Sequence, residues 1–178
     1  AIGLMIGIGA GSVCSRAFGR RYHKKMEDAV NTALRIDVVL AAIFTVLTFI
    51  FIDDLLVFFG ATEENIGYAY DYLSIVLIGL IPQSLSMVLN NLTRAEGRSK
   101  IAMYSLMIAA GANIILDPLF IFGLGLGVKG AAIATVIAQF IGLGFIFYKS
   151  LGKHSNLKIK LDKWLHIDFK TIKEIIVV

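Results

Sequence analysis

The stretch "NIILDPLFIFGLGLGVKGAAIATVIAQ", residues 113–139, decides the fold class of this 178-residue chain. It reads as two apolar helices joined by a Gly-rich turn, yet Asn113, Asp117 and Pro118 fall within its first six residues. A carboxylate in hydrocarbon costs roughly 2.5 to 3.5 kcal/mol on insertion scales, so it is expected there only where it is used. The meaning of Asp117 therefore depends on whether the chain lies in water or in lipid.

Composition indicates lipid. The chain is 57% hydrophobic and 17% charged, with a mean hydropathy of +0.79, which lies outside the range of soluble globular domains. Apolar stretches long enough to cross a bilayer occur at residues 1–18, 34–52, 66–93, 101–122 and 130–148. We therefore predict an all-α integral membrane protein with five transmembrane helices.

The basic residues predict the orientation of these helices. If the chain crosses the membrane at each apolar stretch, all 17 Lys and Arg residues except Lys129 fall on one side. The connection 53–67 carries four acidic residues and no basic one. Because cytoplasmic loops collect positive charge, we expect a multi-pass protein of the plasma membrane with its basic loops in the cytoplasm. The net charge of +4 is then a topology signal, and no nucleic-acid motif accompanies it.

The chain divides into two parts. Residues 1–150 are expected to form a membrane bundle, and residues 151–178 a cytoplasmic linker followed by the start of another membrane helix. The chain begins without Met inside an apolar helix and closes with "TIKEIIVV", so neither end resembles a natural terminus.

Small residues recur at every fourth position of the first helix: Gly3, Gly7, Gly11, Ser15 and Gly19. This spacing predicts a bare face against which a neighbouring helix packs closely. A nucleotide-binding Gly-rich loop is not favoured, because no strand precedes it.

The third helix contains Pro82, which removes one backbone hydrogen bond. The polar residues Gln83, Ser84 and Ser86 follow it, and they either satisfy the freed carbonyl or line a cavity, with Gln83 the candidate for the lining. Asp37 stands close to Arg35 near the predicted inner end of the second helix, and we interpret the two as an interfacial pair.

Asn113 and Asp117 are four residues apart, so they share a helix face. Pro118 cannot donate to the carbonyl of Ile114, which leaves a further oxygen near the carboxylate. Counting inward from the outer helix ends places Tyr72 and Thr135 at the same depth as Asp117 to within one turn. Oxygen ligands at one level suit Na⁺, and a carboxylate can also exchange a proton. We expect these four side chains to form a cation or proton site, and we expect no cofactor and no other metal, since the histidines lack ligand spacing.

Structural interpretations of the same residues remain open. Tyr72 could be an aromatic residue of the membrane interface, and Thr135 could bond back to its own helix. Asp117 could be a carboxylate paired for structural reasons alone.

Four segments together resemble a known family of transporters. These are "GIGAGSVCSRAFGRR", "LNNLTRAEGRSKIAM", the opening stretch 113–139 and the closing "IKEII". They are similar, in order, to the second, fourth, fifth to sixth and early seventh membrane segments of the multidrug and toxic compound extrusion (MATE) transporters. The most specific part is Asn-x-x-x-Asp-Pro followed by Gly-Ala-Ala-x-Ala-Thr.

The resemblance implies helices 2 to 6 of a twelve-helix, two-lobed fold, without the first helix and the carboxy-terminal lobe. It implies a secondary active multidrug efflux antiporter that exports cationic amphipathic compounds in exchange for Na⁺ or H⁺. The family's cation site matches Asp117, Asn113, Thr135 and Tyr72 here, with Na⁺ held by the first three. A further family ligand, an Asp on the first helix, has no counterpart in this chain.

Two rival functions remain. A flippase of lipid-linked oligosaccharide or peptidoglycan precursors would share the fold, but its anionic substrate would favour Arg or Lys inside the membrane. A non-transporting membrane scaffold subunit is the second rival. An enzyme is not expected, because no nucleophile–base pair or metal spacing is present.

Overall fold

The computed structural model describes residues 2–152 together with Ser155, Leu157 and Ile175. In this part of the chain the helices are α1 (Ile2–Gly19), α2 (His23–Ile50), α3 (Ile52–Phe58), α4 (Ile66–Ala95), α5 (Ser99–Pro118), η1 (Leu119–Gly123) and α6 (Gly127–Leu151). The described residues contain no strand, and the predicted all-α class is confirmed.

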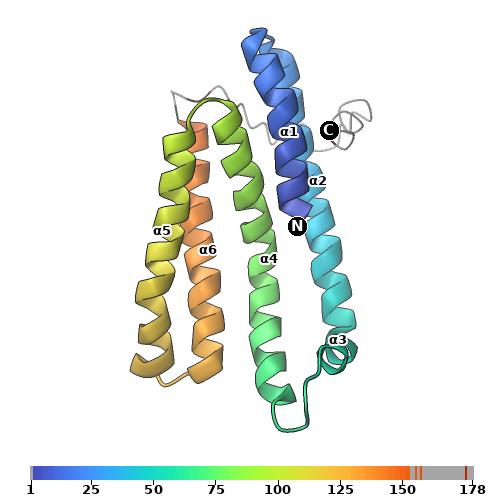
Figure 1. Cartoon of the computed structure of the whole chain (residues 1–178), viewed down its shortest axis with the longest axis vertical. Coiled ribbons are helices and arrows are strands. Elements are labelled where there is room, and N and C mark those ends of the chain that lie inside the picture. Colours follow the sequence, from blue (N-terminus) through green and yellow to red (C-terminus); the bar gives the residue numbers. More distant parts are fainter. Residues whose placement is uncertain (1, 153–154, 156, 158–174, 176–178) are drawn as a thin grey trace.

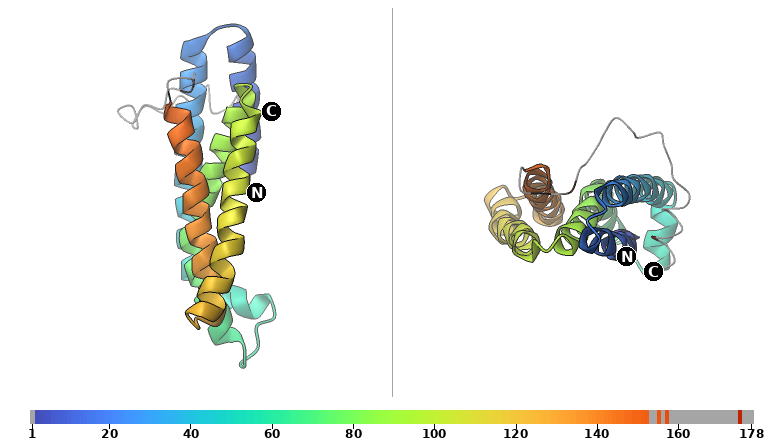
Figure 2. Two further views of the ribbon diagram at one scale, coloured as in Figure 1. Left: turned by 90° about the vertical axis from the view of Figure 1, so that its left-hand side faces the viewer. Right: turned by 90° about the horizontal axis from the view of Figure 1, so that it is seen from above.

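The long helices lie along the long axis of the molecule, and successive long helices run in opposite directions (Figure 1). Seen along that axis, α4 lies between the pair α1–α2 and the pair α5–α6 (Figure 2). The main core lies where α1, α2 and α4 meet, around Met26, Val30, Val88, Leu89 and Leu92. The central helix α4 therefore joins the two halves of the bundle.

Four of the described helical segments are long and apolar enough to cross a membrane: His23–Ile50, Ile66–Ala95, Ser99–Gly123 and Gly127–Leu151. They correspond to four of the five predicted spans. The remaining predicted span forms α1, an 18-residue helix that is not among these four. The short piece after the second span is also helical, as α3.

Helix α2 begins at His23, eleven residues before the predicted start at residue 34. The stretch that precedes residue 34 is rich in charge, which favoured a loop. Met26, Ala29, Val30 and Ala33 nevertheless repeat at helical spacing, and all four are buried. Because the helix is longer than predicted, Asp37 lies near its middle rather than near its end.

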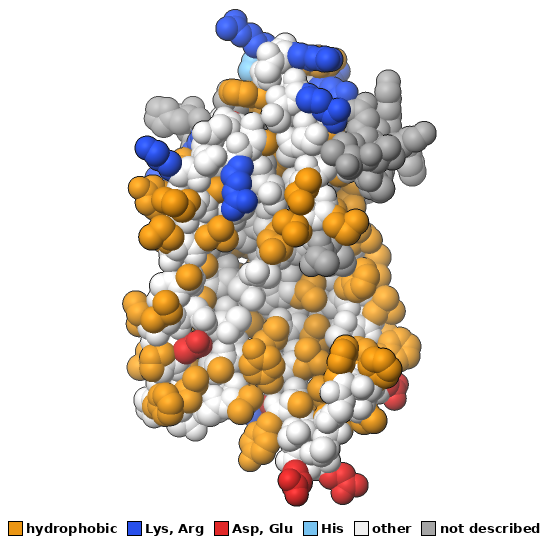
Figure 3. Space-filling view, in the orientation of Figure 1, with side chains coloured by type: hydrophobic (Ala, Val, Ile, Leu, Met, Phe, Trp, Pro, Cys, Tyr) orange, Lys and Arg blue, Asp and Glu red, His pale blue; other side chains and the backbone are white. Residues whose placement is uncertain are grey.

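Charge separates along the bundle. Lys and Arg side chains gather at the end where α1 and α2 meet and where α4 and α5 meet, and acidic side chains mark the opposite end (Figure 3). At the acidic end, Lys129 at the start of α6 forms an ion pair with Asp71 of α4 at 3.0 Å. The predicted separation of charge is present, while the orientation of the two ends relative to a cell remains a prediction.

Three of the five small residues predicted to form the bare face of α1 pack against α4, namely Gly3, Gly7 and Gly11, whereas Ser15 and Gly19 are exposed. A Cβ atom added at Gly7 would lie 2.7 Å from the Asn91 side-chain amide nitrogen, and one at Gly11 would lie 3.6 Å from the Asn91 carbonyl oxygen and 3.8 Å from the Ala95 Cβ. Gly3 approaches Ser84 in the same way. The absence of side chains on α1 thus brings the two helices together.

Close approach also joins α5 to α6. Ser105 Oγ donates a 3.0 Å hydrogen bond to the carbonyl of Gly142, and a Cβ at Gly142 would lie 2.8 Å from that of Ala109. At the other end of the pair, a Cβ at Gly130 would lie 2.6 Å from the carbonyl oxygen of Phe120. Glycine therefore sets the spacing of the helices that carry Asp117 and Thr135.

A polar junction closes the basic end. The guanidinium group of Arg98 lies 3.1 Å from Glu96 and also donates to the carbonyl of Lys149 at 2.9 Å. Ser155 Oγ donates to Glu96 at 3.2 Å. The α4–α5 turn is thereby fixed to the end of α6. The predicted linker and next helix, residues 151–178, otherwise lie outside the described residues.

The substitution Gly130→Ala tests the role of glycine between α5 and α6. The added methyl group meets backbone that cannot rotate away, so we expect the free energy of unfolding to fall by about 1 to 3 kcal/mol. Gly144→Ala on the same helix is the matched control, because a Cβ there meets nothing within 4 Å. Equilibrium unfolding in detergent micelles measures both variants, and equal stability would contradict this account of the packing.

Candidate functional site

Asp117 lies at a break in regular helix geometry. Helix α5 ends at Pro118 and continues directly into the π-helical turn η1. Pro118 has no N–H to donate to the carbonyl of Ile114, which removes one α-helical hydrogen bond beside the carboxylate. The wider turn then bonds at longer spacing, as in the 2.9 Å bond from the Leu124 N–H to the carbonyl of Leu119.

Asn113 connects Asp117 to the neighbouring helix. Its amide nitrogen donates to Asp117 Oδ1 at 3.0 Å and approaches Thr135 Oγ1 of α6 at 3.5 Å. All three side chains are half-buried. The structure thus brings together three of the four predicted site residues. Asn113 and Asp117 lie one turn apart on α5, and Thr135 faces them from α6.

Tyr72 is placed differently. Its side chain is 40% exposed and lines an open pocket formed by α3, the α3–α4 loop, α4 and Val128. Among the described residues, no hydrogen bond joins Tyr72 to Asn113, Asp117 or Thr135. Its role as a fourth ligand therefore stays a prediction.

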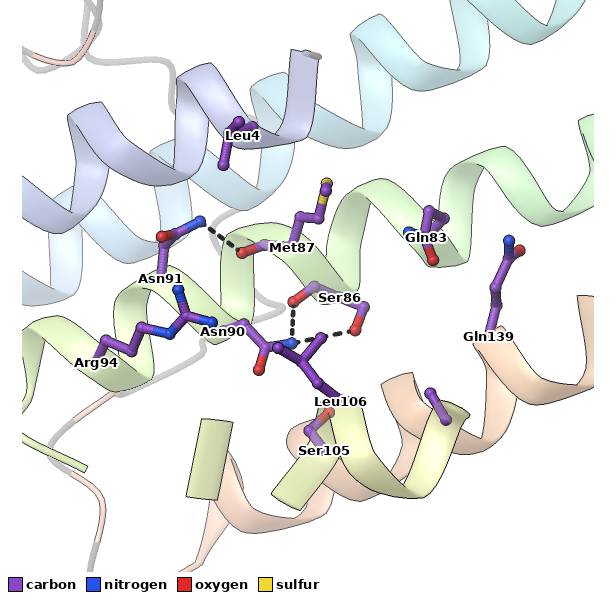
Figure 4. Close-up of a pocket in the computed structure, with 11 residues that line it drawn as sticks. Leu4, Gln83, Ser86, Met87, Asn90, Asn91, Arg94, Ser105, Leu106 and Gln139 are labelled. Atoms are coloured by element: carbon purple, nitrogen blue, oxygen red, sulfur yellow. Dashed lines mark hydrogen bonds between the residues drawn. The ribbon is translucent and has the colours of Figure 1, made fainter. Parts of the chain in front are cut away.

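Gln83 lines a cavity of about 150 Å³ between α1, α4, α5 and α6. Its polar lining comes mainly from amides and hydroxyls: Gln83, Ser86, Asn90, Asn91, Ser105 and Gln139, with Arg94 the charged group (Figure 4). Asn90 and Asn91 bond back to their own helix at Ser86 and Met87. The carbonyl oxygens of the Asn90 and Gln139 side chains have no partner among the described residues.

The polar residues after Pro82 divide between the two predicted uses. Gln83 and Ser86 line the cavity, whereas Ser84 turns the other way and donates to Asp37 Oδ1 of α2 at 2.5 Å. The sequence did not predict that Gln139 lines this cavity, because a single amide in an apolar helix does not by itself indicate a cavity.

The interpretation of Asp37 as an interfacial residue is wrong. Its side chain is 0% exposed and lies in the α2–α4 interface, bonded to Ser84. The error follows from the predicted start of α2, which placed Asp37 three residues from a helix end. The helical spacing of Met26, Val30 and Ala33 was the signal that could have moved that boundary.

Among the described residues, no group of three or more His, Cys, Asp or Glu side chains is arranged to hold a metal ion. The candidate site therefore depends on a single carboxylate with an amide and a hydroxyl.

The chain matches the MatE family model over residues 1–119. This covers more than half of the sequence, including α1 to α5. The chain belongs to the MATE family. Its predicted family resemblance, made on short motifs, is confirmed.

Two curated relatives are multidrug export proteins. MepA of Staphylococcus haemolyticus is 37% identical over 151 residues, which are 84% of this chain and 33% of that protein. MepA of Staphylococcus aureus strain N315 is 32% identical over 148 residues, 83% of this chain and 33% of that protein. The chain thus spans about a third of the length of these relatives, which are transporters rather than enzymes.

Solved MATE structures share the fold. An inward-facing multidrug resistance MATE transporter matches with a TM-score of 0.93 at 29% identity, covering 99% of this chain and 40% of that one. An outward-facing structure matches with a TM-score of 0.91, also at 29% identity, over 99% of this chain and 39% of that one. The arrangement of helices in this MATE chain therefore fits both states closely.

The hydrogen bonds of Asn113 generate a stability prediction. Asn113→Ala removes the donor that holds Asp117, so we expect the free energy of unfolding to fall by about 0.5 to 1.5 kcal/mol. Thr135→Val removes only the longer 3.5 Å contact and should cost less. Unfolding in detergent measures both, and a larger loss for Thr135→Val would show that the cluster is organised around Thr135 instead.

Proposed function

We propose that this MATE chain forms the amino-terminal lobe of a secondary active multidrug efflux antiporter. The complete transporter is proposed to export cationic amphipathic compounds in exchange for Na⁺ or H⁺. The observation that carries the proposal is the hydrogen-bonded cluster of Asn113, Asp117 and Thr135 inside an apolar helix pair. An ionisable group at such a position is expensive and marks an ion pathway.

The protein is proposed to lie in the plasma membrane with its basic end in the cytoplasm. Arg16, Arg20, Arg21, Arg94 and Lys100 stand at that end, and Asp53, Asp54, Glu63 and Glu64 stand at the other. The bias of basic residues supports this orientation. In this orientation Asp117 lies in the outer half of the bilayer.

Asp117 is proposed to bind the coupling ion. Here the amide N–H of Asn113 points at the carboxylate, so the oxygen of that amide points away from it. A proton can be taken up at Asp117 without any rearrangement. Binding Na⁺ through Asn113 requires the amide to turn over and present its oxygen, because Na⁺ is bound by oxygen ligands.

The cavity between α1, α4, α5 and α6, about 150 Å³ in volume, is proposed to form part of a larger drug-binding cavity that is shared with the second lobe. Amides and hydroxyls can bind many polar groups there, and Leu4, Met87 and Leu106 supply apolar contact. Export against a gradient needs two conformations that bind ion and drug with different affinity. The first helix and the second lobe, as in the longer relatives, are proposed partners in that change.

Arg94 supports a second candidate function. It is the charged residue that lines the cavity, so it could bind an anionic group such as a lipid-linked oligosaccharide or peptidoglycan precursor. One MATE-fold structure of the MOP superfamily, from Pyrococcus furiosus, is described as having a pocket of reversed polarity; it matches with a TM-score of 0.89 at 29% identity. A flippase would lose activity on Arg94→Gln, whereas a scaffold subunit would be indifferent to both Arg94 and Asp117.

The decisive experiment is efflux of a fluorescent cationic dye from cells that produce the complete protein, native or Asp117→Asn, at equal membrane expression. We expect Asp117→Asn to lower efflux by about tenfold or more, the change expected when ion binding weakens by roughly 1.4 kcal/mol or more. Imposing Na⁺ and pH gradients in turn identifies the coupling ion.

Asp71→Asn is the matched control, since it makes the same chemical change at an acid 37% exposed and paired with Lys129. Such a pair contributes about 0 to 1 kcal/mol, so efflux should stay near the native rate. Equal efflux by the native and Asp117→Asn proteins would overturn the proposed coupling role. Absence of dye efflux together with movement of lipid-linked precursors would favour the flippase.

A further inference from the structure

A second carboxylate is enclosed in the other half of the bundle. Asp37 lies near the middle of α2, thirteen residues before its end at Ile50, and its side chain is 0% exposed. Ser84 of α4, 8% exposed, donates to Asp37 Oδ1 at 2.5 Å. The second oxygen, Oδ2, is buried and has no hydrogen-bond partner among the described residues. A fully enclosed carboxyl group with one bonded and one unbonded oxygen needs an explanation.

Within the part of the chain that the structure describes, no Lys or Arg of α1 or α4 lies close to this group. The ionisable side chains of α1 are Cys14 and Arg16, eleven or more residues beyond Gly3, which is roughly 16 Å along the helix. In α4 none occurs between Tyr72 and Arg94, which leaves roughly 15 Å on either side of Ser84. On α2 itself Arg35 precedes Asp37 by two residues, or about 200° around the helix.

Helix α1 closes the site. A Cβ atom added at Gly3 would meet Ser84 Oγ at 2.5 Å and the Ser84 carbonyl oxygen at 2.8 Å. Because Gly3 has no side chain, the backbone of α1 lies directly against the residue that bonds Asp37. Water reaches the carboxyl group only if α1 moves away from α4 or α2 moves away from α4.

An unpaired carboxylate sealed from water is far costlier than the neutral acid. We propose that Asp37 is a second proton-binding site of this lobe, which holds its proton while α1, α2 and α4 are packed together and releases it to water when they separate. The unpartnered Oδ2 carries the proton, and Oδ1 accepts the hydrogen bond from Ser84. Binding and release involve one proton and no other reactant.

This site is independent of the candidate coupling site. Asp117 lies on α5 next to α6, whereas Asp37 lies between α2, α4 and α1. The inference does not rest on drug export. It places a titratable group in the half of the lobe where the small residues of α1 pack against α4.

Infrared spectroscopy of the full chain in detergent micelles tests the proposal directly. At neutral pH we expect a C=O stretching band of a protonated carboxylic acid that Asp37→Asn abolishes. Ser84→Ala should shift this band to higher wavenumber, because the C=O group loses the hydrogen bond that lengthens it. Asp117→Asn is the matched control and should leave the Asp37 band in place.

Raising the pH should remove the band and increase deuterium uptake in residues 2–19, measured by mass spectrometry and corrected for the intrinsic exchange rate. The same pH change should not increase uptake in Asp37→Asn. An Asn side chain resembles the neutral acid, so this variant should keep the native helix content.

The proposal is overturned if no protonated band at neutral pH responds to Asp37→Asn or Ser84→Ala, which would mean an ionised Asp37. If Asp37→Asn fails to fold, the Ser84→Ala shift and the pH titration of the native band still decide the question. Dye efflux plays no part in these measurements, so failure here and failure of the proposed transport function are distinguishable.

Discussion

Polar groups inside a hydrocarbon layer must find partners within the protein, and this requirement governs the arrangement of the whole lobe. Asp117 is bonded by Asn113, Ser105 bonds to the backbone of the facing helix, and Asp37 is bonded by Ser84. Asn113 and Asp117 share one helix, whereas Ser105 and Ser84 reach their partners only because two helices approach closely. Gly130 and Gly142 permit that approach between α5 and α6, so the Ser105 contact depends on small residues.

The central helix α4 distributes its polar residues to opposite sides. Ser84 turns toward Asp37 in one half of the bundle, while Gln83 and Ser86 line the cavity toward the other. Pro82, just before them, breaks the regular bonding of the helix at the level where these side chains diverge. A single helix therefore holds polar side chains of both halves of the bundle.

Much of this arrangement could be predicted from sequence. The period of small residues indicated that a neighbouring helix packs closely on α1, without identifying that helix, and the spacing of Asn113 and Asp117 placed them on one face because the helix repeat is fixed. Depth counting placed Thr135 at the same level as Asp117. It could not decide the position of Tyr72, since a depth gives no direction around a helix.

Asp37 was predicted at a helix end because the charged residues before position 34 indicated a loop. The apolar residues among them repeat at helical spacing, and they continue the helix to its true start. The amide Gln139 and the cavity it lines depend on tertiary contacts that no local pattern encodes.

The contact between α1 and α4 also has a consequence for biosynthesis. Gly7 meets Asn91, a residue roughly 80 positions later in the chain. At a synthesis rate of roughly 5 to 20 residues per second, the bare face of α1 waits for about 4 to 16 seconds before its partner exists. Lipid or the insertion machinery must cover that face during the delay. Helix α1 therefore completes its packing only after α4 has been synthesised.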